Sequence, residues 1–273
     1  MPSVFITGTS TGIGRDAALR MAQRGWTVFG GVRSEDAWIG LREASSGAVT
    51  PVMCDVTDLE QVDHAATHVL SATGGNLDGL VNNAGIAVAG PLELVSIEDL
   101  RSQLETNVIG AAAVTRAFIP ALRTARGRIV NVSSASGMFS PPLLGPYSMS
   151  KYALEAMSDT LRRELAPSGI RVSVLQASRI VTPIWEKSLE AATFLERVTD
   201  EDRRWYGRML DGIVAAAKDP SGDPVSLTSD AIEHALTSRR PKTRYRVGAE
   251  ARLIAVAVRL APDRLLDRID PFA

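Results

Sequence analysis

Short apolar runs alternate with amphipathic stretches of helical period over most of the chain. Several of these runs, such as 172–175, are mostly apolar at successive positions, as strands covered on both faces of a sheet require. Strands are therefore expected at 4–7, 27–32, 49–53, 79–82, 128–132, 171–176 and 245–247. The alternation predicts strand–helix–strand units, and so an α/β fold with a doubly wound parallel sheet of seven strands flanked by helices.

The clearest helical pattern begins at Ser96. Ser96 and Asp99 resemble a capping box, with Asp in place of the usual Glu or Gln. Apolar residues then recur at helical spacing over 97–122, and Pro120 is expected to kink or end this helix. A second long helix is expected over about 147–165.

Composition and charge narrow the class of protein. The chain has 273 residues with 45% hydrophobic and 22% charged residues, which suits one domain spanning 1–273. A net charge of −1 without a basic block removes most of the electrostatic case for nucleic-acid binding. Cys54 is the only cysteine, which favours a reducing compartment, and we expect a cytoplasmic protein without a secretory signal. No apolar run approaches the roughly 20 residues of a membrane span.

A glycine-rich turn follows the first expected strand and opens the first expected helix. Its pattern, from Thr7 to Gly14, is TGxxxGxG. Glycines there permit a tight turn and a close approach to a pyrophosphate, and the helix N-terminus favours an anion. The alternative is an ordinary strand-to-helix turn. The residues expected to contact a dinucleotide are Gly8, Thr9, Ser10, Thr11, Gly12, Ile13 and Gly14.

Tyr147 and Lys151 form a YxxxK pattern on the second long helix. Residues four apart share a helix face, so the phenol and the ammonium can meet in one cavity. A free tyrosine has a pKa near 10, and a nearby cation lowers that pKa, which suits reversible proton transfer to an alcohol or carbonyl oxygen. The alternative is a Tyr–Lys pair on the surface.

Together with Asn82-Asn83-Ala84-Gly85, these motifs resemble the short-chain dehydrogenase/reductase family. The tail at 241–248 and 263–267 is similar to the hydroxysteroid and retinol dehydrogenase-like branch. The resemblance implies a single-domain Rossmann-type fold and places the catalytic serine at Ser134, 13 residues before Tyr147. Ser133 and Ser136 are rivals, for which we favour roles in turn hydrogen bonds. The implied catalytic tetrad is Asn107, Ser134, Tyr147 and Lys151.

The resemblance also implies further cofactor contacts. Asp55 and Val56 match the adenine contact, although Asp55 is equally well explained as an acid at a helix N-terminus. Asn83, Ala84 and Gly85 match a segment beside the adenosine ribose, or form a plain Asn/Gly turn. The nicotinamide carboxamide would face Ile180 and Thr182, and Tyr147 and Lys151 also belong to the cofactor site. The family usually has Pro-Gly where this chain has Ala177-Ser178, which puts the geometry at Ser178 in doubt if φ there must be positive.

The end of the second expected strand predicts the choice of cofactor. Members that prefer NAD usually place Asp at the strand end, whereas this chain has Val32 followed by Arg33. A guanidinium can grip a 2′-phosphate with two charge-assisted hydrogen bonds. Hydroxyls of Thr9 and Ser10 could add donors. NADP(H) is therefore the expected cofactor, and NAD(H) stays open because the acids at 35–36 could neutralise the arginine.

Residues 183–224 form a long insertion after the sixth strand. Aromatic and large apolar residues are concentrated in it: Trp185, Phe194, Leu195, Trp205, Tyr206, Met209, Leu210 and Ile213. We interpret this segment as a lid over an apolar substrate, and helix packing alone is the alternative.

The expected function is an NADP(H)-dependent oxidoreductase that interconverts a secondary or primary alcohol and its ketone or aldehyde on an apolar small-molecule substrate, as a homodimer or homotetramer. No metal is expected, because His64 and His68 lack an apparent third ligand. Two alternatives are an idle dinucleotide-binding regulator on the same fold and a sugar-nucleotide epimerase or dehydratase. The latter class usually has TGxxGxxG spacing and a larger C-terminal domain.

Overall fold

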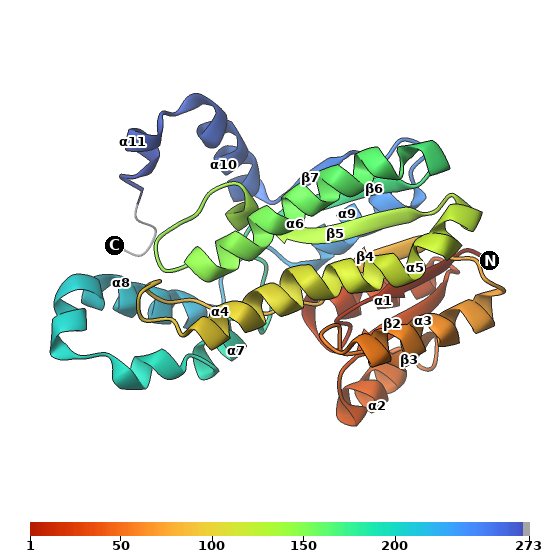
Figure 1. Cartoon of the computed structure of the whole chain (residues 1–273), viewed down its shortest axis with the longest axis horizontal. Helices are drawn as coiled ribbons and strands as arrows, with labels where there is room; N and C mark the ends of the chain where they lie inside the picture. Colours follow the sequence, from red (N-terminus) through yellow and green to blue (C-terminus); the bar gives the residue numbers. More distant parts are fainter. Residues whose placement is uncertain (270–273) are drawn as a thin grey trace.

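A parallel sheet of seven strands organises the computed structural model, which describes residues 1–269 apart from the side chains of Thr193 and Arg197 (Figure 1). The strand order is β3-β2-β1-β4-β5-β6-β7. The chain runs outward from β1 to β3 and then returns to place β4 on the other side of β1. The predicted doubly wound α/β fold is therefore confirmed, with its topological switch between β1 and β4, where such sheets bind ligands.

The strands lie where the apolar runs predict them. Their bounds are β1 Ser3–Ile6, β2 Thr27–Val32, β3 Val49–Met53, β4 Gly79–Asn82, β5 Arg128–Ser134, β6 Arg171–Ala177 and β7 Arg244–Val247. The largest difference is at β5, which runs two residues further than expected. It stays paired with β6 up to the Ser134–Ala177 pair, so Ser134 lies on the last position of a strand rather than in a loop.

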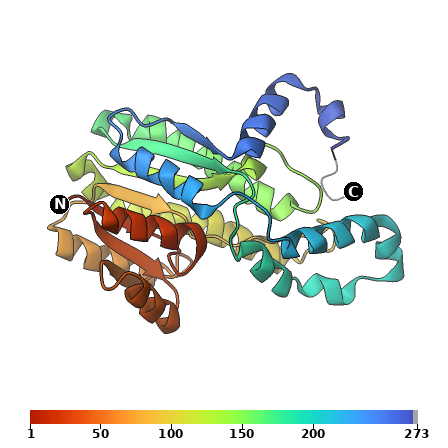
Figure 2. The same ribbon diagram turned by 180° about the vertical axis from the view of Figure 1, so that it is seen from behind.

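Helices cover both faces of the sheet, and each face has its own apolar core (Figures 1 and 2). One face carries α1 (Gly12–Gln23), α2 (Glu35–Ala44) and α9 (Val225–Thr237). The other carries α3 (Leu59–Thr73), α5 (Ala111–Ala125) and α6 (Gly145–Glu164). Coverage on both faces explains why the central strands are apolar at successive positions.

The long helix predicted from Ser96 is continuous but changes its winding. It comprises α4 (Ile97–Leu104), a π-helical turn η1 (Glu105–Gly110) and α5. Ser96 caps it, since its Oγ accepts from the backbone N–H of Asp99 at 3.0 Å. Pro120 does not end it, because α5 continues to Ala125.

This helical run, Ile97–Ala125, is also long and apolar enough to meet the length and composition expected of a membrane span, with mean hydropathy 1.2 in its most apolar window. The domain core accounts for part of that apolar surface. Val114, Phe118 and Leu122 of α5 are fully buried against the sheet and α3, and 39% of the most apolar window is buried. The expectation that no apolar run approaches a membrane span's length is therefore corrected.

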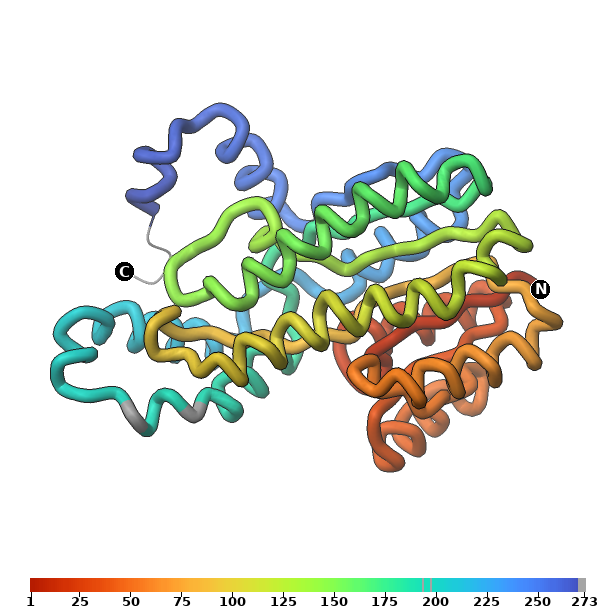
Figure 3. The backbone as a smooth tube through the Cα atoms, in the orientation of Figure 1, coloured from red at the N-terminus to blue at the C-terminus, as the bar shows by residue number. Residues whose placement is uncertain are grey.

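Two groups of helices project beyond the carboxyl ends of the strands (Figures 1 and 3). The first group is α7 (Ile184–Glu190), the short η4 (Thr193–Arg197) and α8 (Asp200–Lys218). The second is α10 (Ala249–Leu260) and α11 (Asp263–Leu266). The short 3-10 turns η2 (Ala135–Gly137) and η3 (Ala166–Ser168) complete the described elements. The projecting groups flank the edge at which the candidate site residues lie.

Candidate active site

The glycine turn lies between the end of β1 and the start of α1, at the switch point of the sheet. Gly8 has φ +68°, and a Cβ added to it would lie 2.7 Å from the Cα of Ala84. A Cβ on Gly14 would overlap the carbonyl oxygen of Gly8. Thr11, at the N-cap of α1, makes no side-chain capping bond, whereas Ser34 and Ser96 cap their helices. The first N–H groups of α1 therefore have no capping side chain, as a cradle for a pyrophosphate requires.

The Asn83 segment fastens this turn. Asn83 donates from Nδ2 to the carbonyl oxygens of Thr7 and Gly8, at 2.9 and 3.0 Å. The backbone N–H groups of Asn83 and Ala84 both donate to Thr7 Oγ1, at 3.0 Å each. Next to them, a Cβ added to Gly85 would lie 3.1 Å from Oδ1 of Asn107, in the π-helical turn η1. This segment is thus a support that joins β4 to the glycine turn, rather than an isolated Asn/Gly turn.

Ser134, Tyr147 and Lys151 come together at the carboxyl end of β5. Ser134 is the last residue of β5, and its hydroxyl is near enough to the Tyr147 phenol to affect its pKa. Tyr147 and Lys151 lie one turn apart on α6, with the ammonium 5.5 Å from the centre of the phenol ring. Lys151 Nζ donates to the carbonyl oxygen of Val132 at 2.9 Å. All of these groups are within or at the edge of the core, where electrostatic effects are strong.

The protonation of this pair differs from the expectation. Burial raises the pKa of Tyr147 to about 12, and only the hydrogen bond with Ser134 opposes that rise. Burial also lowers the pKa of Lys151 to about 8, against the charge of Glu155 on the next turn of α6. The predicted lowering of the Tyr147 pKa by Lys151 is therefore wrong in this arrangement, because desolvation penalises both charged forms. Both shifts favour the neutral form of each group.

Asn107 lies within the π-helical turn η1 and is 2% exposed. Its side chain accepts from the backbone N–H of Ile86 at 2.9 Å and donates to the Ile86 carbonyl at 3.0 Å. It also donates to Ser150 Oγ at 3.1 Å. π turns are rare in proteins overall, and those that occur are often found at functional sites. Asn107 therefore links the segment after β4 to the helix that carries Tyr147.

Two residues of this network were not anticipated from the sequence. Gln103 is fully buried one turn before Asn107, and it bonds Val88 N–H at 2.6 Å and the Ile86 carbonyl at 3.0 Å. Ser150 accepts from Asn107 and donates to the Tyr147 carbonyl at 2.7 Å. The signal that could have found Gln103 is its spacing of four from Asn107, which puts two polar amides on one helix face.

The rival serines occupy different positions. Ser133 is 3% exposed and its hydroxyl has no hydrogen-bond partner within the described structure, so the turn hydrogen bond expected for it is wrong. The backbone N–H of Ser136 donates to Ser134 Oγ at 3.1 Å. Of the three serines, only Ser134 affects the pKa of Tyr147.

Arg33 follows the last residue of β2 and is exposed, and no ion pair involves it among residues 1–269. The neighbouring Ser34 caps α2. Thr9 is fully buried, and its hydroxyl donates to the Gly31 carbonyl at 3.0 Å. The expectation that the Thr9 hydroxyl adds a phosphate donor is therefore wrong, because that hydroxyl ties the glycine turn to β2. Ser10 lies at the surface of the turn and is half-buried.

Asp55 and Val56 follow β3. The Asp55 carboxylate accepts from the backbone N–H and the hydroxyl of Thr57, at 2.9 and 2.7 Å. The helix-capping role belongs instead to Asp58, which accepts from two N–H groups at the start of α3. Val56 is buried, and it packs where a side chain on Gly110 would collide with it.

The segment after β6 closes over the glycine turn. A Cβ on Gly12 would lie 3.1 Å from Thr182 Cγ2, and Ile180 is buried nearby. Ser178 does not have a positive φ, so the strain considered for it is absent. Its hydroxyl donates to Asp223 at 2.6 Å and thereby ties the end of β6 to the loop before α9.

The aromatic segment 183–224 forms a third apolar cluster around α7 and α8. The Trp185 ring meets the Tyr147 ring edge-on, with 5.3 Å between the ring centres. Phe194, Leu210 and Ile213 are buried in this cluster. Trp205 does not belong to it, since its side chain is 73% exposed on the outer face of α8. The sequence thus identified the cluster but chose one wrong member, because the helical phase of α8 points Trp205 outward.

Comparisons with known proteins agree with this arrangement. The short chain dehydrogenase family matches residues 2–193. Retinol dehydrogenase 5 of Mus musculus is 34% identical over 279 residues, which cover 97% of this chain and 86% of the relative. The NADPH-dependent 3-dehydrocapnine reductase of Ornithobacterium rhinotracheale is 34% identical over 277 residues, which cover 98% and 96%. A solved short chain dehydrogenase from Burkholderia cenocepacia J2315, in complex with NADP, has a TM-score of 0.76 and 28% identity over 98% of this chain and 96% of that one.

Proposed function

The chain belongs to the short-chain dehydrogenase family and is an NAD(P)-dependent oxidoreductase, and on that premise we propose that it interconverts an apolar alcohol and its carbonyl compound with Tyr147 as the acid/base. One observation carries the proposal. The buried phenol of Tyr147 lies one helical turn from the buried Lys151 and near Ser134, at the carboxyl edge of the sheet that also carries the glycine turn. A phenol beside a lysine suits reversible proton transfer to an alcohol or carbonyl oxygen next to a bound dinucleotide.

The residues present fit a dinucleotide. The close approaches at Gly8 and Gly14 leave no room for side chains, and the N-terminus of α1 is uncapped by Thr11. We assign the pyrophosphate to this turn, the adenine to Asp55 and Val56, and the ribose region to Asn83, Ala84 and Gly85. The nicotinamide end is assigned to Ile180 and Thr182, with Lys151 holding its ribose. When bound, the nicotinamide supplies or accepts the hydride.

The proton is assigned to Tyr147. In the reductive direction its phenol donates the proton to the oxygen of the carbonyl substrate, and in the oxidative direction it takes the proton from the alcohol. Ser134 orients that oxygen by hydrogen bonding. Lys151 acts on the phenolate by its charge once the proton has left. Asn107 acts as a positioning residue, because its amide holds Ile86 and Ser150 in place.

NADP(H) is the proposed cofactor because Arg33 is exposed and free of ion pairs, within residues 1–269, at the position that decides the recognition of the 2′-phosphate. Two of the similar proteins are named for NADPH or were solved with NADP. Use of NAD(H) would require the ribose to bind without this contact.

An apolar substrate is proposed from the cluster that contains Trp185, which lies against the ring of Tyr147. We therefore assign 183–224 as a substrate lid. A relative named retinol dehydrogenase supports a long apolar alcohol or aldehyde as the first candidate. A cytoplasmic homodimer or homotetramer stays a prediction from the sequence.

Turnover tests the proposal against an idle regulator. The purified protein is incubated with NADPH and a panel of apolar aldehydes, including retinal, and of ketones, while the loss of nicotinamide absorbance is followed. We expect oxidation of NADPH with at least one of them, and less with NADH. Binding of NADPH without turnover on any of them would favour the idle dinucleotide-binding protein.

A further inference from the structure

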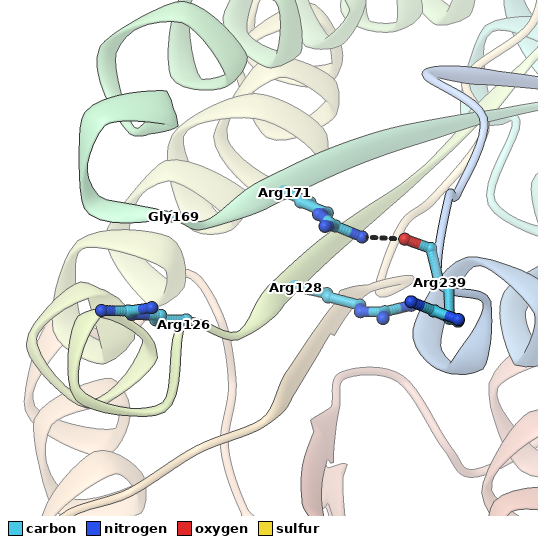
Figure 4. Close-up of a pocket in the computed structure, with 5 residues that line it drawn as sticks. All are labelled: Arg126, Arg128, Gly169, Arg171 and Arg239. Carbon is cyan, nitrogen blue, oxygen red and sulfur yellow. Dashed lines mark hydrogen bonds between the residues drawn. The ribbon is translucent and has the colours of Figure 1, made fainter.

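A shallow hollow of about 460 Å³ lies at the amino ends of β5 and β6, at the opposite end of the sheet from Ser134 (Figure 4). It is lined by Arg126, Arg128, Gly169, Arg171 and Arg239. A neighbouring hollow of about 610 Å³ shares two of these arginines and adds Ser238 and Arg240. We call the two together the arginine basin, with Arg126, Arg128, Arg171, Arg239 and Arg240 as its charged residues.

The basin collects cations from three separate segments. They are the turn between α5 and β5 together with the first residue of β5, the start of β6, and the loop between α9 and β7. In Figure 4 the side chains of Arg128, Arg171 and Arg239 converge, while the Arg126 side chain points away from them. No apolar side chain lines either hollow. The surface is therefore a concentrated positive charge on a chain whose net charge is −1.

No acidic side chain pairs with these five arginines in the part of the chain that the structure describes. Elsewhere arginines do find such partners, for example Arg24 with Glu233 at 2.8 Å and Arg244 with Glu155 at 3.1 Å. Arg128 donates instead to the Ala235 carbonyl at 2.9 Å, and Arg171 donates to the Arg239 carbonyl. A guanidinium carries five N–H groups, so these two bonds leave most donors of the basin available.

Holding the arginines of the basin close together lowers the stability of the protein when no anion is bound. The pKa of Arg128 is lowered by burial and then by the charge of Arg171. Arg126 has φ +50° at the end of α5, in the left-handed conformation that glycine usually adopts at this position. Local features that oppose stability and have no internal compensation are expected at functional sites.

We propose that the arginine basin binds a soluble anion that carries two or more phosphate groups. Guanidinium groups bind phosphate oxygens in pairs of parallel hydrogen bonds, and several of them from different directions match a multiply charged anion. A membrane surface fits less well, because the basin offers no apolar side chain to insert among lipids.

The basin is separate from the cofactor site. β5 runs from Arg128 at the basin to Ser134 at the active site, which spans roughly 20 Å at the usual rise of a strand. The proposal therefore does not depend on the catalytic assignment.

Calorimetric titration with inorganic pyrophosphate at constant ionic strength tests the proposal. The decisive variant is Arg239→Ala combined with Arg240→Ala, because both side chains are exposed and neither makes a side-chain hydrogen bond in the described structure. The control variants are Arg116→Ala, an exposed arginine of α5, and Arg33→Ala at the cofactor end. Thermal melting checks that each variant is folded.

We expect saturable binding by the wild-type protein, unchanged with Arg116→Ala and retained with Arg33→Ala, and weakened about 10-fold or more in the double variant, as the loss of charge-assisted bonds implies. Equal binding by the double variant would overturn the proposal, as would loss of binding in Arg33→Ala alone. No saturable binding by the wild-type protein would also overturn it, including the case in which the protein binds vesicles of anionic phosphatidylglycerol but not pyrophosphate.

Discussion

The two ends of the parallel sheet differ in how far their polar side chains are hydrogen-bonded within the protein. At the carboxyl ends, Asn83 and Asn107 are bonded to backbone groups of other segments, and their amides fix the geometry of the site. At the amino ends, Arg126, Arg128 and Arg171 line one hollow, and none of them forms an ion pair with an acid within residues 1–269. The first arrangement fixes a geometry by satisfying its polar groups, whereas the second leaves donors available for an anion.

The largest effect is expected from Tyr147→Phe, which removes the acid at the carboxyl end and little packing. Turnover should fall by roughly 10²–10⁴-fold, the usual contribution of a general acid/base, while NADPH binding stays similar. The matched control is Tyr152→Phe, five positions later on α6, where the phenol is 46% exposed. Steady-state kcat with a fluorescence titration of NADPH measures both quantities. A kcat for Tyr147→Phe within tenfold of the wild-type value would remove Tyr147 from the chemistry.

Arg33→Ala should have the next largest effect. It removes an arginine at the carboxyl end that forms no ion pair within residues 1–269, and so tests whether an exposed arginine there also binds an anion. Charge-assisted bonds contribute about 1.5–3 kcal/mol, so kcat/KM for NADPH should fall roughly 10- to 150-fold while that for NADH changes little. Arg42→Ala on the neighbouring helix is the control, since that exposed side chain lies over the Trp38 ring. Equal use of NADH and NADPH by the wild-type enzyme would show that Arg33 does not read the phosphate.

A smaller and selective effect is expected from Trp185→Ala. An aromatic pair contributes about 0.5–1.5 kcal/mol beyond its buried area, so kcat/KM for a bulky apolar substrate should fall by up to about 10-fold more than for a small one. Trp205→Ala serves as the control because its side chain points into solvent. If both substrates lose the same factor with Trp185→Ala, the cluster around α7 and α8 only packs helices and is not a lid.

The smallest effect concerns stability at the amino end. Arg126→Gly should raise the free energy of unfolding by about 1 kcal/mol, since glycine adopts a positive φ without the penalty of a Cβ. Arg123→Gly, three residues earlier inside α5, should lower it by about 1 kcal/mol instead. Urea unfolding of the two variants and the wild type measures this contrast. A loss of stability in Arg126→Gly would mean that the arginine side chain holds this end of the sheet together.

The sequence predicted the strands well because most of them contain a short run rich in apolar residues, and because the central strands are buried on both faces. The spacing on α6 also put Tyr147 and Lys151 on one helix face, whereas the choice of Ser134 came from the family resemblance. The strands and the Tyr–Lys pair rest on local patterns, which a linear sequence contains.

Features that depend on three-dimensional surroundings were missed or mistaken. The rise in the Tyr147 pKa comes from burial by several elements, so the Tyr–Lys spacing alone gave the wrong direction. Asn107 lies in a π turn and bonds to Ile86 and Ser150, which are distant in sequence. The arginine basin joins three segments that carry no shared motif, and therefore no pattern along the chain announces it.

The most direct test of the central claim is to follow the hydride itself. The enzyme reduces a substrate found in the turnover screen, with NADPH that carries deuterium at both positions of nicotinamide C4, and the alcohol product is analysed by mass spectrometry. The account predicts a product that carries a single deuterium on the former carbonyl carbon, formed by the wild-type enzyme and at least about 100-fold more slowly by Tyr147→Phe. An unlabelled product, or labelled product formed at the wild-type rate by Tyr147→Phe, would contradict it.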